Sequence, residues 1–506
     1  MRLLLRCDGG PSTGVGHVVR SLAIAQEALA RGHDVTISGR LEGDLLAALV
    51  EDAGPGLTVV PPVDGAQLAE LALDHDVEHV DHYDLAPTTL DVVGAAAQRR
   101  GVRRPVVSVT ADGAFGAQPA DVLIDPTVGA EGVAPAAPAR WHLRGGRFAA
   151  LRRAVTQASH VPRQGGPVRV LVVMGGTDPL GCAPQVVGAL DRCVVPVDVT
   201  VVSSPATAPA LAAHAARWRH GAVHVIAPLA DLPAAMAAAD VVVTAAGTSM
   251  WELSAIGTAM AVVAVVDNQR VGYEQVVEAG AGVGLGGPAD LEDVDTVAAR
   301  LRPLLVDPQE RRRRAEAAHR LVDGRGAWRI VSMLEAAAVA GEQHPAVSVL
   351  RVRPAAMDDA DLLLAWRNDA TTRAVSRQPD AVARPDHVAW LEASLARPDR
   401  HLLVGEVDGE PVGTVRWDEE GEGEWEVSIT VAPQARGRRL APSLLAAAEH
   451  WLAVRCGPDL RGYLAVVHRD NTPSRRLFVG GGYAPDLPPD DAGFERWVRS
   501  VRSGPR

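Results

Sequence analysis

A histidine ends a glycine-rich turn near the start of the chain, in the stretch GPSTGVGHVVRS at residues 10–21. The apolar run 3–5 precedes this turn and a helical pattern follows it, so the turn joins a predicted strand to a predicted helix. A helix N-terminus offers free N–H groups and the positive end of a dipole, which together suit an anion. The same field favours the neutral imidazole, so His17 is a candidate general base for water. The alternative is a capped helix that carries a surface histidine.

A second turn of this kind follows the apolar run 241–244. Its backbone and hydroxyl donors come from Gly247, Thr248 and Ser249. At a helix start, such donors would cradle a diphosphate. Glu252 would accept the hydroxyls of a ribose, or it would instead close a capping box with Ser249. Asn268 and Gln269 follow the next strand, and the carboxyl ends of parallel strands meet at one edge of a sheet.

Two more loops carry polar groups after predicted strands. The loop MGGTDP, which contains Gly176, follows the run 168–173, and the loop DHYD, which begins at Asp81 and contains Tyr83, follows Val80. Taken singly, each loop is more typical of a structural turn than of a site. Taken together with His17, they surround one predicted cleft.

Short apolar runs alternate with helical patterns up to about residue 330. The runs cover residues 2–7, 34–38, 105–109, 121–124, 168–174, 196–202, 223–226, 240–244 and 259–266. Such alternation predicts parallel sheets with helices on both faces, and there are enough runs for two sheets. The polar stretch 160–167, which contains Pro and Gly, marks the break between them. We therefore expect an α/β fold with two Rossmann-like halves, residues 1–160 and 161–340, and a ligand cleft between them.

A separate domain is predicted after a linker at residues 341–348. The chain restarts there with a strand, a helix around 359–368 and strands at 401–407, 411–418 and 424–431. This order is antiparallel in style and predicts an α+β domain over residues 349–506. The stretch VAPQARGRRLAP, residues 431–442, joins a strand to a helix, where successive N–H groups would hold a pyrophosphate. The alternative for this stretch is a basic, solvated helix start.

Composition narrows the class of protein. The chain has 506 residues, 47% of them hydrophobic and 22% charged, which predicts a globular protein of two or three domains. A net charge of −12 argues against nonspecific nucleic-acid binding. The four cysteines are scattered and predict neither a zinc site nor a disulfide framework. Neither a signal peptide nor an apolar stretch of bilayer length is visible, so we expect a cytoplasmic protein without membrane contact.

Six motifs in the first 335 residues resemble, in order and spacing, the PseG-like hydrolases. The motifs are RCDGGPSTGVGHVVR, VDHY, RGGRFAALR, VMGGTDP, AAGTSMWEL and DNQ. That family consists of UDP-2,4-diacetamido-2,4,6-trideoxy-β-L-altropyranose hydrolases of pseudaminic acid biosynthesis, and it shares the GT-B architecture with the glycosyltransferase MurG. The resemblance implies hydrolysis of the bond between UDP and the anomeric carbon of a sugar, with no metal required in principle.

The same resemblance implies roles for single residues. His17 would activate water, Asp8 would shape the loop around it, and Tyr83 would approach the sugar. The substrate would be held by Gly14, Gly16, Asp81, Gly176, Gly247, Thr248, Ser249, Glu252, Asn268 and Gln269. The chain departs from the family near Asp112, where paired acids are usual, and near Asp125, where asparagine is common.

Residues 349–486 resemble the GNAT acetyltransferases, which show RGxGxA and, about 35 residues later, NxxSxxLFxxxGY. This resemblance implies acetyl-CoA as co-substrate and direct attack of an amine on the thioester. The coenzyme would contact Val431, Arg436, Gly437, Arg438, Arg439, Ala441, Asn471 and Ser474. The further resemblance is to the PseH-like branch, which N-acetylates a UDP-4-amino-4,6-dideoxy sugar, and it is carried by Trp366, Arg367, Asn368, His387 and Trp390.

Two positions depart from the GNAT pattern. Arg439 stands where the loop usually has glycine, which is acceptable only if its φ is negative. Phe478 stands where many relatives carry a tyrosine general acid, so the thiolate would leave without that donor, or Tyr483 or water would replace it. Glu426 is a candidate base for the amine, and an outward strand residue is the alternative.

These expectations combine into a bifunctional sugar-nucleotide enzyme of pseudaminic-type acid biosynthesis. The C-terminal domain would acetylate the 4-amino group of a UDP-amino sugar, and the N-terminal part would hydrolyse UDP from the product. Two alternatives stay open: a GT-B glycosyltransferase fused to an acyltransferase, and a domain that binds a nucleotide sugar without catalysis.

Overall fold

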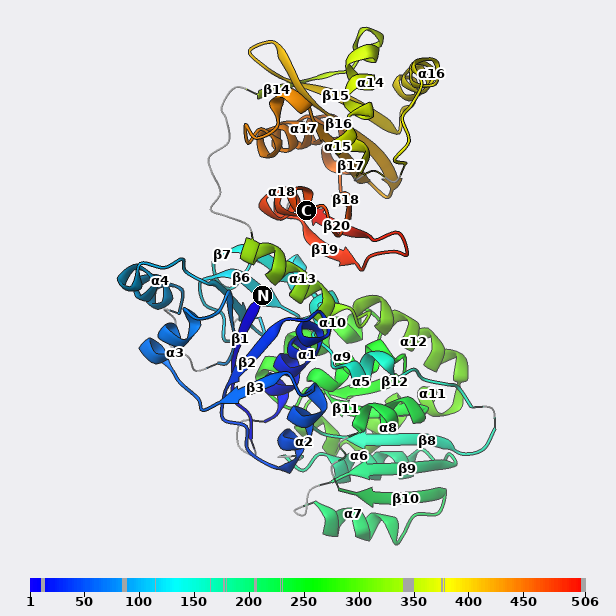
Figure 1. Cartoon of the computed structure of the whole chain (residues 1–506). Coiled ribbons are helices and arrows are strands. Elements are labelled where there is room, and N and C mark those ends of the chain that lie inside the picture. Colours follow the sequence, from blue (N-terminus) through cyan, green and yellow to red (C-terminus); the bar gives the residue numbers. More distant parts are fainter. Residues whose placement is uncertain are drawn as a thin grey trace. The chain divides into compact units, whose positions relative to one another are not determined.

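The chain folds into two compact units, Met1–Leu334 and Glu335–Arg506. Figure 1 shows the computed structural model. The structure describes residues 1–10, 14–83, 89–113, 115–163, 165–175, 178, 180–203, 207–227, 229, 231–339, 350–374, 376 and 378–501. The predicted linker 341–348 and the predicted contact Gly176 lie outside these described residues.

Seven parallel strands form the first sheet, in the order β3-β2-β1-β4-β5-β6-β7. They are β1 (Arg2–Cys7), β2 (Asp34–Ser38), β3 (Leu57–Val60), β4 (Val77–Asp81), β5 (Val106–Thr110), β6 (Ala120–Asp125) and β7 (Ala139–Arg144). Its helices are α1 (Gly16–Ala30), α2 (Asp44–Ala53), α3 (Gly65–Ala72) and α4 (Thr89–Arg100). The central strands β4 and β5 are buried along their whole length, as expected where helices cover both faces of a parallel sheet.

Six parallel strands form the second sheet, in the order β10-β9-β8-β11-β12-β13. They are β8 (Val168–Val173), β9 (Val197–Val202), β10 (Gly221–Ile226), β11 (Val241–Ala245), β12 (Ala259–Val263) and β13 (Val283–Gly284). Its helices are α6 (Ala183–Arg192), α7 (Ala208–Ala215), α8 (Leu232–Ala238), α9 (Thr248–Ile256), α10 (Arg270–Glu278), α11 (Val294–Val306) and α12 (Pro308–Leu321). Both sheets are thus parallel and Rossmann-like, as the sequence predicted, and each has a switch point between its first and fourth strands.

The two halves of the first unit exchange helices. The short helix α5 (Arg153–Gln157) follows the first sheet but packs against α8 and α9 of the second half. The last helix, α13 (Gly326–Val339), returns to the first half. There Arg31 of α1 donates to Ser332 Oγ at 2.9 Å and to the carbonyl oxygen of Trp328 at 3.0 Å. The halves are therefore joined by side-chain contacts as well as by the chain.

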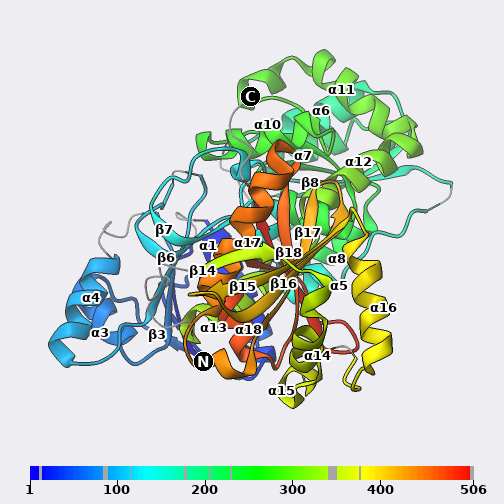
Figure 2. The same ribbon diagram turned by 90° about the horizontal axis from the view of Figure 1, so that it is seen from above.

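The second unit is built on a mostly antiparallel sheet in the order β14-β15-β16-β17-β18-β20-β19. The strands are β14 (Leu350–Pro354), β15 (Arg400–Val407), β16 (Glu410–Gly421), β17 (Glu424–Val431), β18 (Gly462–His468), β19 (Ala484–Leu487) and β20 (Phe494–Ser500). The helices are α14 (Ala360–Asn368), α15 (Ala370–Ala374), α16 (Arg384–Leu395), α17 (Ala441–Cys456) and α18 (Thr472–Gly480). Helices α14 and α16 pack against each other (Figure 2).

The two central strands of this sheet, β17 and β18, pair only over part of their length. They run parallel and pair from Glu424 to Val427 on β17. Beyond Val427, residues 428–431 of β17 and residues 466–468 of β18 no longer pair with each other. The N–H and C=O groups at this point are therefore open to another extended chain.

Candidate active sites

A cavity of about 550 Å³ lies between the two halves of the first unit. Its walls come from the segments that follow β1, β8 and β11, which are the carboxyl ends of strands at the switch point of each sheet. The predicted site residues that line it are Gly14, Gly16, His17, Tyr83, Gly247, Thr248, Ser249, Glu252 and Gln269. Residues from loops more than 200 positions apart in the sequence are thus brought into one cavity.

The helices α1 and α9 begin at this cavity from opposite halves. A Cβ atom built on Gly16 would lie 3.9 Å from Thr248 Cγ2, so the two helix starts face each other. Neither helix has a side-chain cap, and Gly247 is the N-cap residue of α9. The capping box of Ser249 with Glu252, which the sequence left as an alternative, is therefore absent. Both helix starts leave N–H donors and a positive dipole end for an anion.

His17 is held by Asp81, the last residue of β4. Its Nδ1 lies 2.6 Å from Asp81 Oδ1, and the carboxylate accepts two further hydrogen bonds from Arg20, at 2.9 and 2.8 Å. Burial alone would raise the pKa of Asp81, but the charge of Arg20 and the hydrogen bonds from His17 and Arg20 hold it below its usual range. Nη2 of Arg20 also lies 3.1 Å from Nδ1, but the contact to the ionised Asp81 is shorter, so we assign the hydrogen of His17 to Nδ1 and the lone pair to Nε2.

Arg20 extends this network to Asp112, although sequence reasoning gave it no role in the site. Its Nη1 lies 2.8 Å from Asp112 Oδ1, and Asp112 Oδ2 also accepts the Tyr83 hydroxyl hydrogen. Burial opposes the charge of Arg20, but Asp112 and Asp81 raise its pKa well above the ordinary value. Arg20 lies three residues after His17, so both share one face of α1. That spacing was the available signal.

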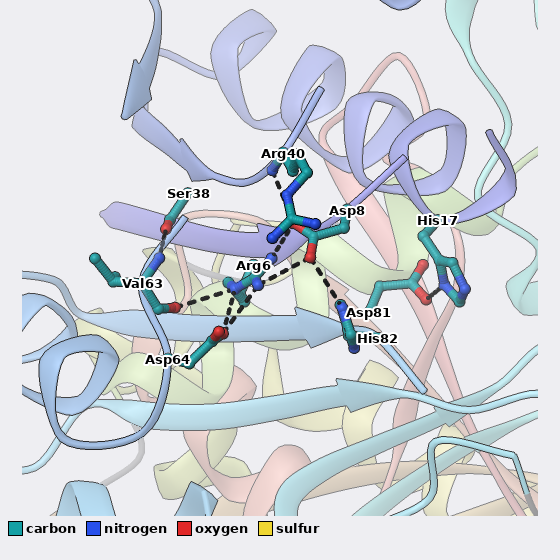
Figure 3. A network of polar contacts seen from close by, with 9 residues as sticks. All are labelled: Arg6, Asp8, His17, Ser38, Arg40, Val63, Asp64, Asp81 and His82. Atoms are coloured by element: carbon teal, nitrogen blue, oxygen red, sulfur yellow. Dashed lines mark hydrogen bonds and ion pairs between the residues drawn. The ribbon is translucent and has the colours of Figure 1, made fainter. Parts of the chain in front are cut away.

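Asp8 belongs to a neighbouring set of polar contacts (Figure 3). Arg6 donates to its two oxygens at 2.6 and 3.0 Å, the backbone N–H of Arg40 donates at 2.7 Å, and His82 Nε2 lies 3.1 Å away. Burial opposes these contacts, yet Arg6, Arg40 and His82 lower the pKa of Asp8 to about 2. Asp8 therefore anchors the loops on either side of it and does not line the cavity.

Glu252 lines the cavity from the second half and is only 5% exposed. Burial raises its pKa to about 7, against the opposing charge of Arg152. Gln269 also lines the cavity, and its Oε1 accepts a hydrogen bond from the N–H of Val265 at 2.9 Å. The side chain of Asn268 lies outside the described part of the chain. A buried carboxyl thus faces the cavity next to the uncapped start of α9.

In the second unit, the predicted pyrophosphate loop leads into the start of α17, which has no side-chain cap. Gly437 has a φ of +76° and Arg439 a φ of +57°. The sequence-based condition of a negative φ at Arg439 is therefore wrong, and the arginine takes the left-handed conformation that glycine adopts without strain. The uncapped start of α17 still leaves N–H groups that suit an anion.

Two predicted coenzyme contacts have structural partners. Arg436 forms an ion pair with Asp369 at 2.7 Å and donates to Thr372 Oγ1 at 2.8 Å. Asn471 caps α18, because its side chain accepts the N–H of Ser474 at 3.2 Å. Both residues are thus fixed in position before any ligand binds.

A second cavity, of about 390 Å³, lies in this unit. The resemblance-based residues Trp366, Arg367, His387 and Trp390 line it together. Ser428 and Thr430, in the part of β17 that no longer pairs with β18, form another wall. Glu426 lies two residues before Ser428 on the same face of β17 but does not line the cavity.

Comparison with protein families matches residues 361–480 to the model of the acetyltransferase (GNAT) family. The match covers the stretch from α14 to α18, including the loop before α17 and the diverging strands β17 and β18. The C-terminal part of the chain is a GNAT acetyltransferase domain.

Solved structures that resemble the GNAT domain include other acetyltransferases. An aminoglycoside acetyltransferase AAC(6')-Ib in complex with coenzyme A is 17% identical, covers 30% of this chain and 94% of its own, and has a TM-score of 0.27. A spermidine N-acetyltransferase from Vibrio cholerae with CoA and spermine is 15% identical, covers 30% and 96%, and has a TM-score of 0.28. The ribosomal L7/L12 alpha-N-protein acetyltransferase RimL with CoA is 14% identical, covers 31% and 97%, and has a TM-score of 0.28. These TM-scores are too low to support an inference by themselves. No curated protein matches the chain.

Tyr483 cannot replace the tyrosine that Phe478 displaces in the GNAT domain. Tyr483 is fully buried, and its hydroxyl donates to Glu449 Oε1 at 2.8 Å. Burial and the neighbouring Glu449 raise the pKa of Tyr483 well above its ordinary value. The structure therefore does not favour Tyr483 as the proton donor, and departure of the thiolate without a donor and protonation by water remain the alternatives.

The described residues contain no group of three or more His, Cys, Asp or Glu side chains arranged to hold a metal ion. Among the helices in the described ranges, none combines the length and the apolar character needed to cross a bilayer.

Proposed function

We propose that the chain is a bifunctional sugar-nucleotide enzyme. Its GNAT domain transfers the acetyl group of acetyl-CoA to the amine of a UDP-4-amino-4,6-dideoxy sugar. Its first unit, a GT-B-type pair of Rossmann-like halves, then hydrolyses UDP from the acetylated product. One observation supports the hydrolase proposal most. His17, which contacts Asp81, lines the same cavity as Glu252 and the uncapped start of α9.

Hydrolysis follows from the groups around this cavity. Nε2 of His17 takes a proton from water, and the oxygen attacks the anomeric carbon while the bond to UDP breaks. Asp81 stabilises the imidazolium that forms, because its carboxylate already accepts the Nδ1 hydrogen. The charge that develops on the departing diphosphate meets the N-termini of α1 and α9. Glu252 accepts the hydroxyls of the ribose.

Acetyl transfer uses the loop before α17 and the cavity beside β17. The pyrophosphate of acetyl-CoA lies on the N–H groups at the start of α17, and the pantetheine arm lies along the end of β17 that no longer pairs with β18. In the cavity, Arg367 donates through Nη2 to the Gln378 carbonyl at 2.7 Å, but its buried Nη1 has no partner among the described residues. An anionic group of the acceptor would satisfy that atom, which favours a nucleotide-linked amine over a polyamine.

The experiment is an incubation of the full chain with a UDP-4-amino-4,6-dideoxy sugar, with and without acetyl-CoA, followed by mass spectrometry of the products. We expect an acetylated sugar nucleotide first, and then equal amounts of UDP and free diacetamido sugar. His17→Ala stops UDP release and leaves acetylation intact. His224→Ala, on the exposed edge strand β10, is the matched control and leaves both steps unchanged. If UDP is released only when a sugar acceptor is added, the first unit is a glycosyltransferase and the proposed hydrolysis is wrong.

A further inference from the structure

His387 has a buried ring nitrogen without a hydrogen-bond partner among the described residues. It lies on α16, lines the second cavity and is 3% exposed. The backbone of Ala360 favours the charged form of the ring, whereas Nε2 is buried and has no partner in the described part of the chain. We assign the hydrogen to Nδ1, which leaves the lone pair on the unpartnered Nε2.

The charged groups around His387 come from three elements. Asp361 and Arg367 lie on α14, Asp386 precedes His387 on α16, and Arg416 lies on β16. Burial lowers the pKa of His387, and the charge of Arg367 adds to this effect while that of Asp361 opposes it. The imidazole is therefore neutral at physiological pH and able to accept a proton.

The cavity also reaches the predicted position of the coenzyme. Ser428 and Thr430 line it from the part of β17 that no longer pairs with β18. The ring of Trp390 lies 5.4 Å from that of His387, between centroids, and limits how the imidazole can rotate. A group bound in this cavity would thus lie between His387 and the diverging strands.

We propose that His387 is the base that takes the proton from the ammonium group of the acceptor. This inference rests on the acetyl transfer proposed above. Nε2 accepts one proton from the ammonium group, and the freed amine nitrogen forms a bond to the thioester carbonyl carbon. The C–S bond then breaks, the thiolate receives the second amine proton through water, and His387 returns its proton to solvent. Glu426, the base candidate from the sequence, does not line this cavity.

The test compares the full chain with His387→Asn, in which an amide N–H replaces Nδ1–H and the basic nitrogen is lost. With acetyl-CoA and a UDP-4-amino-4,6-dideoxy sugar, we expect kcat for thiol release to fall by about 10²–10⁴-fold. The KM for acetyl-CoA stays unchanged, because the coenzyme loop is untouched. Raising the pH toward the pKa of the acceptor amine restores part of the activity, because the amine then arrives unprotonated.

The matched control is His401→Asn, on β15, which replaces another partly buried imidazole. His401 stacks on Trp425 outside the cavity, at 5.1 Å between ring centroids. We expect its kcat and pH profile to match those of the unaltered chain. A His387→Asn protein with the unaltered kcat and pH profile overturns the inference and leaves the proposed acetyl transfer standing. Failure of the unaltered chain to acetylate the probe overturns the proposed function instead. If His387→Asn does not fold, the dependence of kcat/KM on pH in the unaltered chain is the second test. A base at His387 requires the midpoint of the acidic limb to lie below the pKa of an ordinary histidine, and a higher midpoint overturns the inference.

Discussion

The imidazole Nδ1 of His17 lies 2.6 Å from Oδ1 of Asp81, although 64 residues separate them in the chain. The contact forms because β1 and β4 are neighbours at the switch point of the first sheet, so the helix after β1 begins beside the end of β4. Arg20, one turn along the same helix, fixes the other carboxylate oxygen at 2.9 Å. The sheet topology thus orients the imidazole of His17.

Asp81→Asn is expected to reduce UDP release by about 10²–10⁴-fold, because the amide cannot stabilise an imidazolium and can also favour the wrong tautomer of His17. The measurement is a steady-state assay of UDP, with acetylation by the same sample as the check on folding. Asp121→Asn is the matched control. It removes a carboxylate that pairs with Arg104 at 2.6 Å and does not line the cavity. Equal UDP release from both variants would show that the Asp81 contact does not assist the reaction.

Glu252 is expected to make UDP binding depend on pH. Burial raises its pKa to about 7, and the carboxylate is the form that accepts ribose hydroxyls, so UDP affinity should increase from pH 6 to pH 8. Glu252→Gln should weaken binding by about 10–100-fold at pH 8, and by less at pH 6. Calorimetric titration at the two pH values measures this, with Glu274→Gln, an exposed change on α10, as control. An unchanged pH dependence in Glu252→Gln would contradict the assignment.

Glu78 is expected to make the first unit less stable as the pH rises. It is fully buried on β4, neither carboxyl oxygen has a partner among the described residues, and burial raises its pKa from 4.5 to about 8. Its folded form is protonated, so stability is full below pH 4.5 and falls between pH 4.5 and pH 8 by about 1.4 kcal/mol per pH unit.

Replacing Glu78 by Met removes the group that titrates. The difference in Tm between Glu78→Met and the unaltered chain should therefore grow from pH 5 to pH 8. Glu51→Met, an exposed change on α2, should show no such growth. A constant difference across this range would mean that Glu78 does not bind a proton on folding.

Arg439→Gly is expected to leave the GNAT domain as stable or more stable. A φ of +57° costs an arginine about 1–2 kcal/mol, which offsets the greater freedom that glycine has in the unfolded chain. Arg438→Gly, at the neighbouring position with an ordinary φ, lacks this relief and should destabilise by about 0.5–1 kcal/mol. Differential scanning calorimetry of the two variants compares them directly. A larger loss of stability in Arg439→Gly than in Arg438→Gly would contradict backbone strain at Arg439.

The sheets were the most predictable part of the structure. The runs 2–7 and 34–38 match β1 and β2, because most of the buried positions of these strands carry apolar side chains. The edge strand β3 and the alternating strand β7 were not predicted, since they are only partly buried. The run 259–266 is too long, because its last three residues follow β12 and leave the sheet.

The turns that form the site could be predicted from the sequence, whereas the hydrogen-bond partners of its side chains were harder to predict. Glycine-rich turns after strands identified His17 and the start of α9, because local sequence encodes such turns. The bonds of Arg20 to Asp81 and Asp112 could not be predicted, since they depend on how three strands lie side by side. The partner of Tyr483 could not be predicted either. Glu449 lies on α17, and the sequence does not show how this helix packs in the tertiary structure.

The return of α13 to the first half changes where an expression fragment can end. A fragment cut at residue 325 would contain every strand of both parallel sheets and still lack the hydrogen bonds from Arg31 to Trp328 and Ser332. Because His17 and Glu252 belong to different halves, such a fragment would keep both residues but lose part of what holds the two halves together. A fragment meant to preserve the cavity therefore has to extend past Ser332, and the first compact unit ends at Leu334.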